Sequence, residues 1–251
     1  MSTWIFLRGL TRESRHWGDF PAVFRGEIAD AEVVAPDLPG NGRLNHLRSP
    51  ASVEAMADYC RADLLARGVR PPYYLLAMSL GAMVAVAWAQ RHPQEVRGCV
   101  LINTSLRPFS RLHERLRPRN YPALLKLAVL GGSDAEAAER SILRLTSRCR
   151  GDGAAILAAW IAWRREHPVS RANALRQLLA AARYRAPAQR PAVPLLVLAG
   201  AKDALVDPRC SQRLAQRWQA EFAAHPDAGH DLPLDAGAWV ARQVRRWLPA
   251  L

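Results

Sequence analysis

The stretch from Tyr73 to Gln90 reads YYLLAMSLGAMVAVAWAQ, and it decides the fold. Its first part is a short apolar run of strand length. Its second part is rich in Ala, Met, Val and Trp with few polar residues, which is typical of a buried helix. Arg91-His92-Pro93 ends that helix, because proline cannot continue the backbone hydrogen-bond ladder. Ser79 lies between the two parts, so the chain must turn sharply from strand to helix there.

Small residues lie two positions to either side of this serine, in the pattern Ala77-Met78-Ser79-Leu80-Gly81. Larger side chains at those two positions would crowd a sharp bend, which is the reason behind the G-x-S-x-G pattern of nucleophilic serines. Alanine departs from the first glycine but keeps the volume small. Such a bend exposes Ser79 Oγ and aims the Leu80 N–H at a reacting carbonyl oxygen. The alternative interpretation is an ordinary strand-loop-helix with a capping serine.

Strands and helices alternate through most of the chain. The expected strands are 4–7, 31–35, 73–78, 98–103, 194–200 and 220–224, and the expected helices of the sheet layers are 20–28, 50–67, 80–91, 210–218 and a final helix around Trp239 to Leu248. Ser49 and Pro50 suit the cap and first position of the second helix. This alternation predicts an α/β fold with a doubly wound, mostly parallel sheet of about six strands.

The alternation stops between Leu106 and Pro187, where no strand is expected. Four helices are predicted there, at 124–130, 135–145, 154–163 and 170–184. We therefore expect a helical cap, residues 106–187, inserted into a core made of residues 1–105 and 188–251.

Composition sets the class of the protein. The chain has 251 residues and half of them are hydrophobic, so a sizeable core is available. No run is long enough to span a bilayer, and the N-terminus does not resemble a signal peptide. The four cysteines, Cys60, Cys99, Cys149 and Cys210, are widely spaced, which indicates reduced thiols and a cytoplasmic location.

The formal charge of +13 raises the question of a nucleic-acid partner. Lys126 and Lys202 are the only lysines, so nearly all the positive charge comes from arginine. A GC-rich genome would give this bias. No nucleic-acid-binding motif accompanies the charge. We therefore expect no nucleic-acid partner.

A serine nucleophile needs a base, and the base needs an acid that orients it. Asp203 follows the 194–200 strand and is the favoured acid, with Asp207 as the alternative. His230 lies between the last strand and the last helix and is the favoured base, with His225 as the alternative. No third ligand suggests a metal site at the two histidines. The loop after the first strand, Arg8-Gly9-Leu10, would supply a second backbone N–H, that of Leu10.

The chain resembles the α/β-hydrolase superfamily, in its small esterase-like branch with a helical cap. The resemblance covers nearly the whole length, and the motifs that carry it are Arg8-Gly9, Asp37-Leu38-Pro39-Gly40-Asn41-Gly42, the Ser79 pentapeptide, Gly200-Ala201-Lys202-Asp203 and Gly229-His230. It implies a triad of Ser79, Asp203 and His230, and an oxyanion hole formed by the Leu10 and Leu80 N–H groups. Besides Ala77, two departures stand out. Arg8 occupies the position where relatives usually have histidine, and the usual first hairpin is missing.

The resemblance implies a serine hydrolase, foremost a carboxylic ester hydrolase that needs no metal or organic cofactor. A thioesterase or acyltransferase with the same triad is the second hypothesis, and an inactive binding protein of the same fold is the third. A small-molecule ester or acyl compound is the expected substrate. Within the cap, Phe109, Tyr121, Trp160 and Trp163 are candidates for an apolar substrate pocket, with cap core as the alternative. Arginines 107, 111, 115, 117 and 119 could attract an anionic substrate or an acidic acyl carrier, or form a solvated face.

Overall fold

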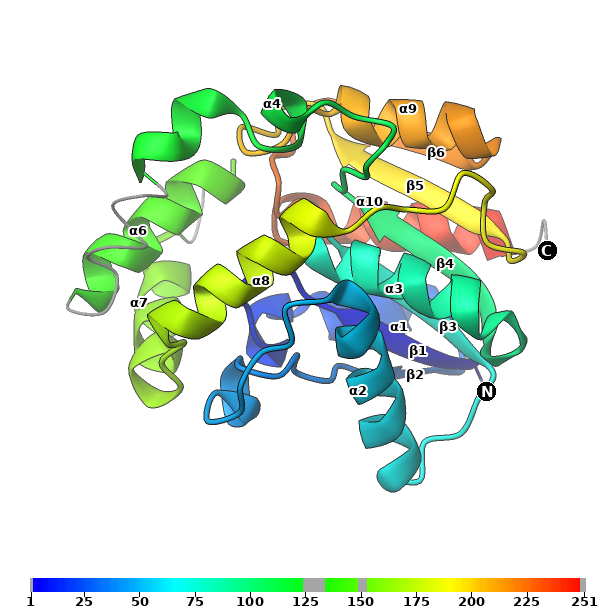
Figure 1. Ribbon diagram of the computed structural model, residues 1–251, viewed down its shortest axis with the longest axis horizontal. Helices are drawn as coiled ribbons and strands as arrows, with labels where there is room; N and C mark the ends of the chain where they lie inside the picture. Colours follow the sequence, from blue (N-terminus) through cyan, green and yellow to red (C-terminus); the bar gives the residue numbers. More distant parts are fainter. Residues whose placement is uncertain (1, 124–133, 149–152, 249–251) are drawn as a thin grey trace.

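The computed structural model describes residues 2–123, 134–148 and 153–248 (Figure 1). Its strands are β1 (Ser2–Leu7), β2 (Ala31–Val34), β3 (Tyr73–Met78), β4 (Val96–Ile102), β5 (Leu195–Gly200) and β6 (Glu221–His225). Its α-helices are α1 (Phe20–Glu27), α2 (Val53–Ala66), α3 (Leu80–Arg91), α4 (Leu112–Arg115), α6 (Ala135–Thr146), α7 (Gly153–Glu166), α8 (Arg171–Arg183), α9 (Arg209–Trp218) and α10 (Leu232–Trp247). Short 3-10 helices cover Ser14–Trp17, Gly42–Leu44, Pro93–Glu95 and Pro118–Asn120.

The six strands form one sheet in the order β2-β1-β3-β4-β5-β6, and every neighbouring pair is parallel. Helices α2, α3 and α9 contribute to the core on one face, whereas α1 and α10 contribute to the core on the other. The doubly wound parallel sheet predicted from the sequence is therefore confirmed. The predicted 124–130 helix and Cys149 lie outside the described residues.

Burial on both faces explains why the strands are continuous apolar runs rather than alternating ones. In β1, Ile5 and Leu7 pack into the core on one side of the sheet, and Trp4 and Phe6 pack into the core on the other. All four side chains are fully buried. Between β4 and β5 the described residues form helices and one isolated β-bridge, between Arg107 and Arg185, and α6, α7 and α8 lie to one side of the sheet in Figure 1.

One predicted helix start was wrong. The second helix begins at Val53, capped by the Ser52 hydroxyl, which accepts a hydrogen bond from the Ala55 N–H at 3.2 Å. Ser49 is instead fully buried, and its hydroxyl donates to the Pro39 carbonyl at 2.6 Å. The Ser49 hydroxyl also accepts a hydrogen bond from Gln177 Nε2 of α8 at 2.9 Å. The serine therefore ties α8 to the segment between β2 and α2, a role that a local capping pattern cannot show.

Among the described residues, no helix combines the length and the apolar character needed to cross a bilayer.

Gly81 tests how tightly the central strand, its helix and β1 are packed. A Cβ at this position would lie 2.3 Å from the Leu7 carbonyl oxygen and 2.6 Å from that of Arg8. Backbone atoms cannot give way easily, so Gly81→Ala should lower the free energy of unfolding by roughly 1–3 kcal/mol. Equilibrium unfolding in urea measures this change.

The matched control is Gly26→Ala in α1, where a Cβ would meet nothing within 4 Å. Alanine is the better helix former there, so the control should gain about 0.5–1 kcal/mol. Equal effects of the two substitutions would contradict the packing account.

Candidate active site

Ser79 lies at a strained turn between β3 and α3. Its φ of 53° and ψ of −118° are rare for a residue with a side chain. The Ser79 N–H is anchored to the Ile102 carbonyl at 3.0 Å, which fixes the turn against β4. Ala77 is fully buried, so the sheet accommodates its methyl group. A Cβ on Gly9 would lie 3.2 Å from Ser79 Cβ, so the loop after β1 passes directly beside the serine.

His230 and Asp203 form a buried hydrogen-bonded pair. His230 Nδ1 lies 2.7 Å from Asp203 Oδ2, and the residues are 4% and 3% exposed. The other carboxylate oxygen, Oδ1, accepts hydrogen bonds from the Leu205 N–H at 2.8 Å and the Val206 N–H at 3.0 Å. Since a carboxylate only accepts, His230 Nδ1 carries the proton and Nε2 is left as the base.

The pKa of His230 reflects opposing influences. Burial lowers the pKa, but the negative charge of Asp203 and its hydrogen bond raise it. Asp231 raises it further, and Arg8 lowers it. The net result is a pKa above the ordinary histidine value, so Asp203 stabilises the imidazolium form.

Asn103 is a supporting residue that the sequence analysis did not single out. It follows β4 with a φ of 45°, and its Nδ2 donates to the Gly229 carbonyl at 3.0 Å and the His230 carbonyl at 2.7 Å. Its Oδ1 accepts from the Gly200 N–H at 2.8 Å. Asn103 therefore joins the ends of two strands to the histidine loop. The sequence feature that could have revealed it is a single asparagine directly after the buried apolar strand.

Arg8 joins the loop after β1 to the histidine loop. Its Nη1 and Nη2 donate to the two Asp231 oxygens at 3.1 and 2.6 Å, and both side chains are nearly fully buried. The guanidinium also lies over the Trp17 ring, with Cζ 4.8 Å from the ring centroid. Arg8, which stands where relatives usually have histidine, therefore has a defined partner in Asp231. It holds the Gly9-Leu10 segment against the residue next to His230.

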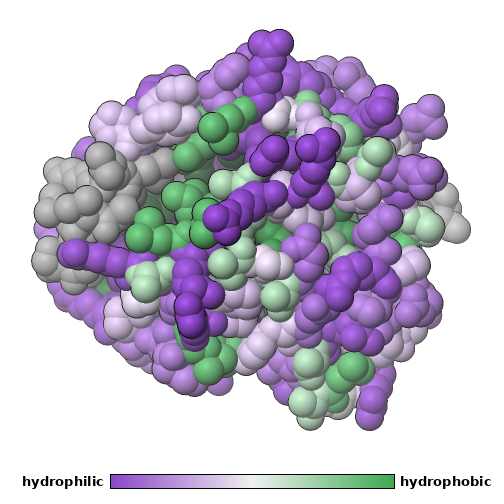
Figure 2. All heavy atoms as spheres, in the orientation of Figure 1, coloured by the Kyte–Doolittle hydropathy of each residue, from purple (hydrophilic) through white to green (hydrophobic). Residues whose placement is uncertain are grey.

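Ser79 and His230 line one cavity of about 210 Å³. The loop residues Arg8, Gly9 and Leu10 contribute to its wall, and its apolar residues are Leu10, Met78, Leu116, Ile142, Leu145, Ala174, Leu175, Leu178 and Leu205. Side chains from α6, α7 and α8 thus face the ends of β1 and β3 across this space. Leu175 and Leu178 are 54% and 42% exposed. Figure 2 shows a hollow with hydrophobic side chains beside it, where α8 runs in Figure 1.

The two residues expected to supply the oxyanion donors are both close to the serine in the fold. Leu10 lines the cavity, and Leu80 is the first residue of α3, directly after Ser79. The first N–H groups of a helix have no partner within the helix, so the start of α3 offers donors and a positive dipole end next to Ser79. The arrangement brings a hydroxyl and an imidazole with its acid to one apolar cavity, beside the start of α3.

The alternative acid and base lie elsewhere. Asp207 is engaged by Arg209, at 2.6 Å between Oδ2 and Nη2. His225 packs against Trp239, and its Nδ1 accepts from the Asp227 and Ala228 N–H groups at 3.2 and 3.1 Å. No group of three possible metal ligands occurs among the histidines, cysteines and acids that the structure describes.

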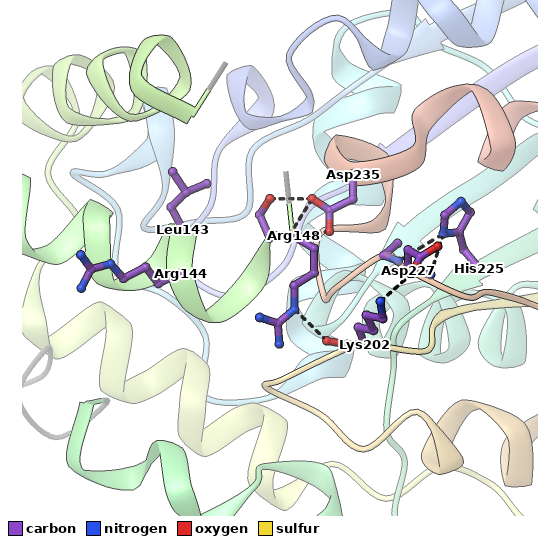
Figure 3. A pocket seen from close by; sticks show the side chains of 9 residues that line it. Leu143, Arg144, Arg148, Lys202, His225, Asp227 and Asp235 are labelled. Carbon is purple, nitrogen blue, oxygen red and sulfur yellow. Dashed lines mark hydrogen bonds and ion pairs between the residues drawn. The ribbon is translucent and has the colours of Figure 1, made fainter. Parts of the chain in front are cut away.

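His225 belongs to a second hollow, which is also lined by Arg148, Lys202 and Asp235 (Figure 3). Here Asp235 accepts from the Arg148 N–H at 2.9 Å and from the Gly229 N–H at 2.7 Å, while Arg148 Nε donates to the Lys202 carbonyl at 3.2 Å. The end of α6 is therefore bound to both loops that carry Asp203 and His230. The hollow is lined by side chains of both positive and negative charge. Its hydrogen bonds hold the loops that carry Asp203 and His230.

The four aromatic candidates do not line the cavity that holds Ser79. Phe109 packs edge-on against Trp218, and Tyr121 is 42% exposed. Trp160 is buried beneath the Arg12 guanidinium, and Trp163 packs against His16. The structure places leucine and isoleucine side chains at the cavity instead, because the aromatic faces of α7 are turned toward the arginines and the histidine.

The five arginines between positions 107 and 119 differ in their exposure and partners. Arg115 is buried and donates to the Ala181 and Ala182 carbonyls at 2.6 and 3.4 Å, so it serves to pack α8. Arg117 lies 4.0 Å from Asp207. Arg107, Arg111 and Arg119 are exposed.

Residues 4–243 match the model of the alpha/beta hydrolase family. The chain belongs to this family. The resemblance inferred from its motifs is therefore confirmed, and its relatives agree with the expectation of an esterase-like enzyme. The pimeloyl-[acyl-carrier protein] methyl ester esterase of Aromatoleum aromaticum is 30% identical over 228 residues, covering 85% of this chain and 88% of that protein.

Two further esterases of the same name show how the coverage varies. The Neisseria meningitidis protein is 31% identical over 212 residues, with 77% of this chain and 75% of that protein covered. The Chromobacterium violaceum protein is 38% identical, but over 92 residues that span 37% of this chain and 34% of the relative.

Solved structures share the fold at low identity. The enol-lactonase of Burkholderia xenovorans superposes with a TM-score of 0.80 at 18% identity, covering 99% of this chain and 91% of that one. A thermophilic esterase of Thermogutta terrifontis gives a TM-score of 0.74 at 23% identity, covering 100% and 90%. These likenesses show the architecture of the chain.

The buried Arg8–Asp231 pair yields a test of the site's stability. Arg8→Met leaves the Asp231 carboxylate buried without its partner, and breaking a buried pair in this way costs about 3–5 kcal/mol. We expect a loss of that size in urea unfolding. The double variant Arg8→Met/Asp231→Leu removes both charges and should recover most of the loss.

Arg245→Met is the control, since Arg245 pairs with Glu27 on the surface at 2.8 Å with a side chain 58% exposed. Exposed pairs contribute about 0–1 kcal/mol. An Arg8 substitution no more harmful than this control would show that the buried pair does not hold the site.

Proposed function

We propose that the protein is a carboxylic ester hydrolase that works through Ser79, His230 and Asp203. The observation that carries the proposal is that Ser79 and His230 line the same cavity, each held in a defined conformation. One is a serine held at a strained turn, and the other is a buried histidine whose base nitrogen is set by an aspartate. Strained backbone and a buried acid–base pair are features that cluster at active sites.

The reaction has two halves. His230 Nε2 takes the Ser79 proton as Oγ attacks the ester carbonyl, and the same imidazolium then protonates the departing alcohol. Water attacks the resulting acyl-enzyme with His230 as base, and the carboxylic acid leaves with Ser79 restored. Asp203 keeps His230 in the productive tautomer and stabilises its charged form in both halves.

The carbonyl oxygen gains negative charge in each half, and the Leu10 and Leu80 N–H groups are the proposed donors to it. Removal of one such donor typically lowers kcat by about 10²–10³-fold. The Arg8–Asp231 pair acts indirectly here, because it holds the Leu10 segment next to the histidine loop. Arg8 is thus a positioning residue in this proposal.

Residues 106–187 are proposed to be the cap that shapes substrate access, over a core of residues 1–105 and 188–251. Support comes from the cavity, whose wall combines residues from both parts of the chain. Its mostly apolar wall suits an acyl or alkyl chain. The proposed chemistry needs no metal or organic cofactor.

A carrier-linked ester is the second candidate substrate. Relatives covering most of this chain are named as esterases of an acyl-carrier-protein methyl ester. Exposed arginines 107, 111 and 119 and the formal charge of +13 would favour an acidic carrier. We also propose a cytoplasmic location, which fits the free buried thiols of Cys60, Cys99 and Cys210.

Labelling with an alkyl fluorophosphonate tests the nucleophile. Wild type should be labelled at one serine, and Ser79→Ala should not be labelled, because the probe needs an activated hydroxyl. Intact-protein mass spectrometry measures the adduct. Equal labelling of both proteins would assign the nucleophile to another residue, and no labelling of the folded wild type would favour an inactive binding protein.

The pH profile tests the histidine. Neutral His230 is the base, so kcat/KM should rise with pH through the raised pKa of His230 and then level off. Asp203→Asn removes the charge that raises this pKa, so the inflection should move to lower pH. The plateau should fall by roughly 10⁴-fold, as in the serine-protease template. An inflection that stays in place would remove Asp203 from the proposal.

Salt dependence tests the carrier. Hydrolysis of an ester linked to an acidic carrier should lose kcat/KM steeply as ionic strength rises, since screening weakens long-range attraction. A small neutral ester serves as the control and should show little change. Equal salt dependence for the two substrates would contradict a carrier-docking role for the arginines.

A further inference from the structure

Two arginines form part of the cavity wall that holds Ser79 and His230. Arg12 follows the loop after β1, and Arg164 comes from α7. Their side chains are 8% and 17% exposed. Neither has a part in the proposed ester chemistry, and most of the cavity wall is apolar. Two cationic groups in such surroundings require an explanation.

Glu139 of α6 is the carboxylate that both arginines share. Arg12 Nη1 donates to its Oε2 at 2.7 Å, and Arg164 Nη1 lies 3.2 Å from its Oε1. No other carboxylate pairs with either arginine within the described ranges 2–123, 134–148 and 153–248. One carboxylate between two guanidinium groups leaves one positive charge at the wall.

The neighbouring buried charges do not balance this surplus. Arg8 also lines the cavity, but Asp231 neutralises it. Glu13 is bound by Arg15 and lies 3.2 Å from His167 Nδ1. Arg15 also pairs with Glu166, but the Glu166 side chain is 58% exposed, so solvent screens its charge. His16 contacts Arg12, but burial and then the Arg12 charge lower its pKa well below the ordinary value, so His16 is neutral.

One donor atom of Arg12 has no hydrogen-bond partner among the described residues. Nη2 is buried, and within the described part of the chain no atom accepts a hydrogen bond from it. Nη1 is already used by Glu139 and by His16 Nε2 at 3.0 Å. The Trp160 ring covers the guanidinium, with Arg12 Cζ 4.2 Å from the ring centroid. An acceptor must therefore approach in the plane of the group, and an unmet buried donor costs about 1–3 kcal/mol.

We propose that Arg12 and Arg164 form an anion subsite in the active-site cavity, which binds a carboxylate of the substrate away from the reacting ester. A carboxylate supplies the in-plane acceptors that guanidinium groups favour, and it neutralises the surplus charge. The apolar residues that line the same cavity suit a hydrocarbon chain. The inference rests on the proposed function and narrows the substrate class to monoesters of dicarboxylic acids.

Matched esters test the proposal in wild type. Monomethyl esters of unbranched dicarboxylic acids of increasing length are compared with their neutral dimethyl diesters, with a statistical correction for the two ester groups. At the best length, kcat/KM for the monoester should exceed that for the diester by roughly tenfold, mainly through KM, as one hydrogen bond to a charged group gives. Equal values at every length would overturn the subsite.

The variant Arg164→Gln removes one cation and leaves Glu139 paired with Arg12. It should reduce the preference for the monoester by roughly tenfold. Arg165→Gln is the control, because this neighbour makes the same change of charge at an exposed position of the same helix. A purely structural role would instead raise KM for both esters alike in Arg164→Gln, and that result would reject the proposal.

Binding to Ser79→Ala separates the subsite from catalysis. Calorimetric titration with the preferred monomethyl ester should give a Kd that rises roughly tenfold when Arg164→Gln is added and stays constant when Arg165→Gln is added. This result without any ester turnover in wild type would overturn the proposed function and keep the subsite. Turnover of both esters by wild type, with a Kd that Arg164→Gln does not change, would keep the proposed function and overturn the subsite.

Discussion

The site depends on how closely the turn at Ser79 packs against the end of β1. Ser79 adopts a φ of 53°, and such a strained conformation persists only where the surrounding structure holds the backbone in place. Gly81 lies where a Cβ would meet the Leu7 carbonyl oxygen at 2.3 Å, and Gly9 lies where a Cβ would touch Ser79. Two missing side chains thus let strand, helix and loop converge on one hydroxyl.

The parallel sheet then determines what else can reach that hydroxyl. All six strands run the same way, so the loops that follow β1, β3 and β5 open at the same edge. Asn103 links the ends of β4 and β5 to the histidine loop after β6, and the Arg8–Asp231 pair links the loop after β1 to the same histidine loop, all with buried hydrogen bonds. The polar contacts are costly to break once buried, so they hold the loops in a single arrangement.

Much of the fold could be predicted because both faces of the sheet are buried. Strands such as β1 and β5 are continuous apolar runs, and the serine, aspartate and histidine follow strands at positions that the pattern indicates. The prediction that Ser49 caps the second helix was wrong, because its buried hydroxyl donates to the Pro39 carbonyl and accepts from Gln177 instead. Both partners lie outside that helix. Local spacing carries no information on such partners.

The contacts that tune the site were the hardest to foresee. Arg8 and Asp231 are 223 positions apart, and no periodicity relates them. Trp160 was expected to face substrate, yet it covers Arg12, because a guanidinium and an indole ring can satisfy each other in a buried place. Charged residues in the helices between β4 and β5 have no regular spacing that would reveal which of them turn toward the cavity.

The central claim is that Ser79 becomes acylated during turnover. The most direct measurement is rapid acid quenching of the enzyme with an activated ester, followed by peptide mass spectrometry to locate the acyl group. The account predicts a transient acyl group on the peptide containing Ser79, formed in wild type and strongly reduced in His230→Gln. An acyl group on another residue, or ester hydrolysis with Ser79→Ala at the wild-type rate, would contradict it.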